Sequence, residues 1–264
     1  GTVSLYLNNA TMSGAFTNNG GTTIFTGTTA NYTGAFTITG SAVTLTSGTA
    51  GTVAFSSTVN SAANVGNTAS AANPLTVSAG SGNVTFTGVV GGATNGALGA
   101  LTVNTTGTTT FSAAVTTGTG VALTNTTGTI TFTGALTTGV LNIGAQAFNL
   151  SLPASTGSIT DTVTFANTGT LRLGATSGTQ TYTGGFTATA PSSITLHGIF
   201  NASGVVEIGD SGTGITLGSN TIISTASGNA DLTLAGAITG SGINLSLSSG
   251  SGVINVSKIG RAHV

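Results

Sequence analysis

Apolar and polar residues alternate along short stretches of the chain, and nearly the same stretch returns many times. In the phrase GTITFTGALT, Ile130 and Phe132 fall on one side of an extended strand. Thr129, Thr131 and Thr133 fall on the other side, and the phrases TTTFS and NVTFT keep the same parity. No segment sustains the period of about 3.6 residues that a helix needs, and Thr, Val, Ile and Phe favour pleated strands. The pattern therefore predicts strands throughout and negligible helix.

The alternating phrase belongs to a longer repeat. Its pattern is an aromatic or aliphatic residue, a Thr, Ser or small residue, two small residues, an apolar residue and a Thr. The copies begin at Met12, Tyr32, Phe111, Phe132, Tyr182 and Leu234, and looser copies begin at Phe55, Phe86 and Leu196. A second strand signature, with successive starts 26, 20, 20 and 30 residues apart, begins at Leu75, Leu101, Val121, Leu141 and Leu171. Repeats of this length indicate a solenoid, because one turn cannot bury its inward side chains alone.

The sequence thus predicts an all-β parallel β-helix with about 20–30 residues per turn. We expect residues 1–257 to form a single β-helix that is a fragment of a longer repeat protein, since the chain lacks an initiator Met. Residues 61–74 and 152–160 break the period and are predicted to be loops that bulge from a turn. The end of the chain, IGRAHV, resembles a translated sequencing adapter, so we expect residues 258–264 to be a non-native tail.

The composition excludes several classes of function. Only seven of the 264 residues are charged and the formal net charge is −1, so we expect no nucleic-acid partner. The absence of Cys excludes disulfides, thiolate metal sites and Cys nucleophiles. No apolar run approaches the roughly 18 residues of a membrane-spanning helix, so we expect no membrane insertion.

Candidate chemistry is sparse. The carboxylates are Asp161, Glu207, Asp210 and Asp231, and only Glu207 and Asp210 lie near each other in sequence. A solvated strand residue followed by a turn Asp explains this pair better than an acid and a base that act together. His197 takes the Thr position of the repeat, which predicts an outward, exposed side chain, and no second His of secure origin exists to share a metal. We therefore predict no catalytic residue, no metal site and no cofactor.

The Thr residues form the one arrangement with functional promise. Outward Thr-x-Thr triplets on stacked turns would make a flat ladder of hydroxyl and methyl groups, which is similar to the face of ice-binding solenoids. The simpler explanation is that Thr suits an exposed strand that carries no charge. The candidate ladder consists of Thr85, Thr87, Thr108, Thr110, Thr129, Thr131, Thr133, Thr162, Thr164, Thr179, Thr181 and Thr183.

Asn-x-Ser/Thr sequences recur along the chain, as a composition rich in these residues makes inevitable. They permit glycosylation without indicating it. Glycosylation stays open at the Asn-x-Ser/Thr sequences that are predicted to lie at turns, such as those that begin with Asn104 and Asn125.

The phrases TFTGALT and LTVNTTG, with the Gly- and Thr-rich composition, resemble the bacterial β-strand repeat proteins. These include filamentous-haemagglutinin-like proteins and autotransporter passenger solenoids. The resemblance implies a right-handed parallel β-helix that passes an outer-membrane pore and is displayed outside the cell as an adhesin or stalk. It implies surface glycans or proteins of host or neighbouring cells as partners. We therefore expect a non-catalytic structural or adhesive segment of a secreted bacterial surface protein. An ice-binding β-solenoid and a polysaccharide-acting β-helix enzyme stay open as alternatives.

Overall fold

The computed structural model describes residues 4–7, 9–25, 27–39, 42–47, 51–61, 73–92 and 96–259. These residues fold as an all-β parallel β-solenoid of about 10 turns with roughly 22 residues per turn, and they contain no helix. The predicted parallel β-helix and the predicted lack of helix are confirmed. The chain divides into two compact units, Gly1–Gly139 and Val140–Val264, which are described separately.

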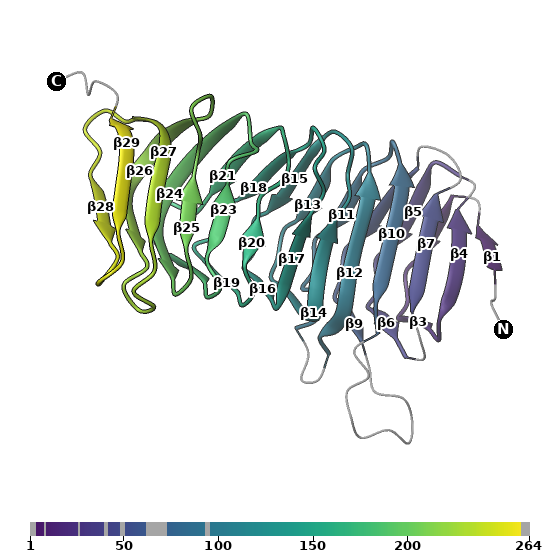
Figure 1. Ribbon diagram of the computed structural model, residues 1–264. Helices are drawn as coiled ribbons and strands as arrows, with labels where there is room; N and C mark the ends of the chain where they lie inside the picture. The colour runs from purple at the N-terminus through teal and green to yellow at the C-terminus, as the bar shows by residue number, and fades with distance from the viewer. Residues whose placement is uncertain are drawn as a thin grey trace. The chain divides into compact units, whose positions relative to one another are not determined.

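Unit 1 places three strands on each turn, and equivalent strands of successive turns pair in parallel rows (Figure 1). The first row is β1 (Ser4–Leu7), β4 (Gly21–Phe25), β7 (Val43–Ser47), β10 (Leu75–Gly80) and β12 (Leu98–Thr105). The second row is β2 (Ala10–Met12), β5 (Thr29–Tyr32), β8 (Thr52–Phe55), β11 (Val84–Phe86), β13 (Thr109–Phe111) and β15 (Thr129–Phe132). The third row contains β3 (Phe16–Asn18), β6 (Phe36–Ile38), β9 (Val59–Ser61) and β16 (Leu136–Thr138). The long strand β14 (Val115–Leu123) pairs with both β16 and β12.

Unit 2 repeats this plan after β17 (Val140–Ile143). Its first row contains β18 (Asn149–Leu152), β21 (Thr170–Leu173) and the beginnings of β24 (Ser193–Ala202) and β26 (Gly214–Ser224). The second row contains β19 (Thr156–Ile159), β22 (Thr179–Tyr182), the ends of β24 and β26, and β28 (Leu245–Ser248). The third row contains β20 (Val163–Thr164), β23 (Phe186–Ala188), β25 (Val206–Ile208), β27 (Leu232–Thr239) and β29 (Ile254–Ile259).

The core of unit 1 is built on a stack of aromatic rings along its second row. The rings of Tyr32, Phe55, Phe86, Phe111 and Phe132 follow one another with centroids 5.0, 4.7, 4.8 and 4.2 Å apart, and neighbouring planes differ by 9°, 9°, 7° and 11°. All five side chains are buried. Burial of one such side chain contributes roughly 1.5–3 kcal/mol. In-register stacking of identical positions therefore turns a repeated phrase into one continuous core.

The Gly of the repeated phrase lies at a corner where successive turns approach closely. A Cβ at Gly134 would lie less than 3.0 Å from the carbonyl group of Ala113 on the preceding turn. At Gly14, which holds the same place in the first copy, a Cβ would have no heavy atom within 4 Å. The close approach at Gly134 is not found in every copy, since Ser57 and Ala113 hold the same place in their own copies.

The prediction that residues 152–160 bulge as a loop is wrong. Strand β19 lies inside this range and pairs with β22, with Ile159 opposite Tyr182. Gly157 takes the inward position where other copies carry a larger side chain, opposite the buried Gln180, whose Nε2 donates hydrogen bonds to the carbonyls of Leu152 and Ala154. The sequence does not alternate apolar and polar residues here, because Gln180 on the next turn supplies the buried side chain opposite Gly157.

The second strand signature also needs a correction. Leu171 pairs with Leu150 on the preceding turn, so the apparent 30-residue step joins strands that are not equivalent. The predicted loop at 61–74 lies outside the described residues except for Ser61, Asn73 and Pro74. In the predicted tail, Lys258 and Ile259 complete β29 and residues 260–264 lie outside the described part.

Candidate functional site

The longest registered group of candidate ladder residues lies on unit 1. Thr85 on β11 pairs with Thr110 on β13, and Thr110 pairs with Thr131 on β15. All three are half-buried and lie between buried, inward-facing neighbours. In the other direction the row continues to Ala54 and Asn31, so three hydroxyl groups follow one another before the row is interrupted.

Four more candidate residues flank this row on the same unit. Thr108 is exposed before β13, and Thr129 begins β15 as a half-buried residue. Thr87 and Thr133 are exposed where their strands end, and their N–H groups donate 2.8 Å hydrogen bonds to carbonyls of the preceding turn. Unit 1 therefore brings seven of the twelve candidates onto one outward face of three neighbouring turns.

The five candidates on unit 2 lie in two different rows. Thr179 and Thr181 belong to β22, where Thr181 pairs with Ser158 on one side and Asn201 on the other. Thr183 follows the same strand and is exposed. Thr164 lies on β20 in another row, opposite Thr187.

Thr162 is exposed beside β20, and its hydroxyl donates a 2.9 Å hydrogen bond to the carbonyl of Gly184. In the row of Thr181, Ser158 lies on one side and Asn201, Ser224 and Ser248 follow on the other side, so no neighbour in this row is Thr. The twelve residues are therefore not one continuous ladder, and among them Thr pairs with Thr over three successive turns at Thr85, Thr110 and Thr131. Other described Thr residues also stack in register, as in the row of Thr22, Thr44, Thr76 and Thr102 and the row of Thr195, Thr216 and Thr239.

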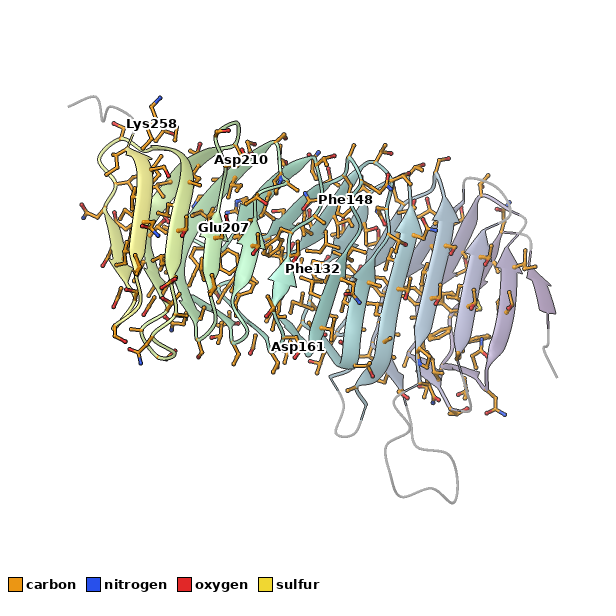
Figure 2. The ribbon with its side chains drawn as sticks, viewed as in Figure 1. Phe132, Phe148, Asp161, Glu207, Asp210 and Lys258 are labelled. Carbon is orange, nitrogen blue, oxygen red and sulfur yellow. The ribbon has the colours of Figure 1, made fainter. Side chains whose placement is uncertain are left out.

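The carboxylates of unit 2 do not converge. Glu207 faces outward from β25 between Thr187 and Thr233, and Figure 2 shows Asp161 at the opposite edge of the unit from Asp210. The Oδ1 atom of Asp210 accepts hydrogen bonds from the N–H groups of Gly212 and Thr213 at 2.8 and 2.7 Å. These bonds lower the pKa of Asp210.

Turn capping also occupies Asp231, whose Oδ1 accepts a 2.8 Å hydrogen bond from the N–H of Val253 on the next turn. Among the described residues, no three His, Asp or Glu side chains come together as metal ligands. The arrangement is that of a solvated strand residue and turn carboxylates, as the sequence favoured.

His197 differs from its prediction in one respect. It faces outward from β24, but it is half-buried rather than exposed, and its Nδ1 is buried with no hydrogen-bond partner. Burial lowers the pKa of His197, and the nearby positive charge of Arg172 lowers this pKa further. Gly218 makes this burial possible, because a side chain there would overlap the imidazole ring. The sequence signal was weak, since Gly218 lies a full turn away.

Asn residues have a role that sequence reasoning missed. Oδ1 of Asn83 accepts a 2.9 Å hydrogen bond from the N–H of Thr108, one turn later, and Asn149 and Asn220 do the same for Thr170 and Asn244. These side chains satisfy backbone donors at corners, where strand pairing stops. These three Asn residues lie several turns apart in the sequence, so no one-turn recurrence pointed to this role.

Burial of Asn125 excludes its glycosylation in the folded chain, which the sequence had left open. Asn125 is 0% exposed, accepts a hydrogen bond from the N–H of Thr105 and donates one to the hydroxyl of Thr109. A folded chain cannot present this amide to an enzyme. Asn104 is exposed on β12.

Comparison with known proteins supplies no identity: neither a family model, nor a curated protein, nor a solved structure matches the chain. Within the described residues, no helix is long and apolar enough to cross a membrane. The β-solenoid fold is therefore what is established, and function has to be argued from the surface.

Proposed function

We propose that this chain is a non-catalytic structural and adhesive segment of a large secreted bacterial surface protein. The observation that carries the proposal is the chemistry of the outward rows, which consist mainly of Thr, Ser, Asn and Ala. The row of Thr131 in unit 1 and the row of Thr181 in unit 2 are both of this kind. Short neutral side chains lose little conformational entropy when they are ordered, so they suit an extended contact surface.

The carboxylates support a non-catalytic role. Asp210 and Asp231 are engaged by backbone N–H groups at turns, and Glu207 has Thr residues as its row neighbours. General acid–base catalysis requires two such groups, or one and a base, within reach of the same substrate bond. Neither Asp210 nor Asp231 is free to serve as a mobile proton donor while it caps a turn.

In this proposal the chain leaves the cell through an outer-membrane pore and contacts glycans or proteins of a host or neighbouring cell. Parallel solenoids suit such export, because each turn adds to the one before it and needs no distant partner. The absence of Cys is consistent with folding outside the cell without disulfides.

The experiment is to measure binding of the purified chain to whole cells and immobilised glycans, with polysaccharide hydrolysis and lyase assays in parallel. The proposal predicts saturable, weak binding and no release of sugar ends. Turnover that is lost in Glu207→Gln or Asp210→Asn would contradict it and favour the enzyme alternative.

Ice binding is a second candidate, favoured by the in-register row of Thr85, Thr110 and Thr131. The interruption of that row at Ala54 weighs against a lattice match. Microscopy of ice crystals grown with the chain tests this candidate. Faceted crystals that become round when Thr110 is replaced by Tyr would make ice binding the better function.

A further inference from the structure

An irregularity in the pairing of β24 with β26 creates an unusual outward position. Leu196 pairs with Leu217 and Gly198 with Thr221, so one residue of β24, His197, faces three residues of β26. Both strands pass from the first row of unit 2 to the second here, so this bulge is a corner of the solenoid at which β26 takes the longer path and leaves His197 facing it. The bulge is held in place because the Oγ of Ser219 accepts a 3.2 Å hydrogen bond from the N–H of Gly198.

The imidazole of His197 lies in the notch that Gly218 leaves open. A Cβ at Gly218 would come within 3.0 Å of Cε1, Nε2 and Nδ1 of the ring, so the ring occupies the place of a side chain. Nδ1 is buried without a partner, and a proton there would have no acceptor. The neutral tautomer that carries its proton on Nε2 is therefore favoured, and Nε2–H is the donor that the ring can offer to a ligand.

Arg172 lies diagonally across the same face. It pairs with Thr195 on β24, and Thr195 and His197 point to the same side of that strand. Diagonal neighbours in a sheet are within reach of long side chains. In the described part of the chain the guanidinium makes no hydrogen bond and no ion pair, and its charge is felt at His197.

The described strands that pack most extensively against β24 carry no acidic side chain. Strands β21, β22 and β26 pack against β24, and besides Arg172 they carry only one titratable side chain, the buried Tyr182. Asp210 precedes β26, but its Oδ1 is engaged by the N–H groups of its own turn. Two basic groups close together without an acid leave donors for an anion unused.

We propose that Arg172 and His197 form a binding site for the carboxylate of an acidic saccharide. The guanidinium provides two parallel N–H donors and the imidazole provides Nε2–H. Sugar hydroxyls next to the carboxylate meet the row of Thr195, Thr216 and Thr239, which continues from Arg172 over the following turns. This inference rests on the proposed adhesive function and specifies the ligand class.

The test is a titration of the full chain with a galacturonate oligomer, followed by NMR of the His197 imidazole and by calorimetry. A neutral galactose oligomer, acetate and inorganic phosphate are titrated in parallel. Arg172→Gln should weaken galacturonate binding at least about tenfold, since hydrogen bonds to charged groups are the strong ones. Lys258→Gln removes the same charge from β29 and should leave binding unchanged.

A bound carboxylate should also raise the pKa of His197, because a nearby negative charge favours the imidazolium. This upward shift should be absent in Arg172→Gln. Equal affinity in the two variants, or galacturonate that leaves the His197 signals unmoved, would overturn the inference. Phosphate that binds while galacturonate does not would overturn the saccharide assignment. Neutral glycans that bind equally to all variants would overturn this site but leave the adhesive function standing.

Discussion

Replacing Phe111 by Ala tests whether the stack of rings carries the stability of unit 1. Its ring lies between those of Phe86 and Phe132, with centroids 4.8 and 4.2 Å away and nearly parallel planes. The side chain is 0% exposed, and Phe→Ala changes in such cores cost about 3–5 kcal/mol. Each stacked pair adds about 0.5–1.5 kcal/mol beyond the buried area, and Phe111→Ala loses two pairs. Because measured Phe→Ala losses already include such ring contacts, we expect a loss near the upper end of that range, about 4–5 kcal/mol.

The matched control is the neighbouring Thr110→Ala. Thr110 lies on the same strand, one residue earlier, but faces outward and is half-buried, so we expect a cost within about 0.5–1 kcal/mol. Urea unfolding followed by far-ultraviolet circular dichroism gives both free energies. A third variant, Phe111→Leu, keeps part of the volume without the ring faces and should fall between the two.

Equal losses of unfolding free energy in Phe111→Ala and Thr110→Ala would refute the reasoning, because an inward and an outward side chain would then contribute equally to stability. A loss in Phe111→Leu as large as in Phe111→Ala would instead assign the stability to ring stacking rather than to filled volume.

Three further predictions concern corners and titrating groups. Gly134→Ala should lower the unfolding free energy because its Cβ would meet the carbonyl of Ala113, whereas Gly14→Ala has open space and should change little in the same urea assay. The pKa of Asp210 is lowered by backbone N–H donors. Its contribution to stability is therefore present above the ordinary Asp pKa and is lost as pH falls through the pKa of Asp210 in the folded chain. Thermal melts across acid pH should show this loss in the parent chain but not in Asp210→Ala. Burial raises the pKa of Tyr182, so stability should be full below about pH 10 and fall as pH rises above it, more steeply than in Tyr182→Phe, in unfolding curves recorded at rising pH.

The candidate site could be found from the sequence only in part. The outward position of the Thr residues follows from parity, because a pleated strand sends alternate side chains to opposite faces. Which Thr residues become neighbours does not follow from parity. Thr85, Thr110 and Thr131 meet because their turns are in register, whereas Thr181 meets Ser158 and Asn201.

Arg172 and His197 show the same limit for chemistry. They are 25 residues apart, and only the stacking of β21 on β24 places them on one face. The burial of the imidazole depends further on Gly218, on a third turn. No local sequence pattern could predict a site whose residues come from three different turns.

The sequence by itself determined the fold class, the absence of helix in the described residues, and the inward place of Phe132 and its counterparts. These properties are local, because alternation with period two and Gly-rich joints act within a few residues. The tertiary structure alone decided that Gly157 takes an inward position opposite Gln180. It also decided that Asn125 is buried and that Leu171 pairs with Leu150. Register between turns is set by the total packing of each turn on the next, and short loops of varied length change that register without changing the strand pattern.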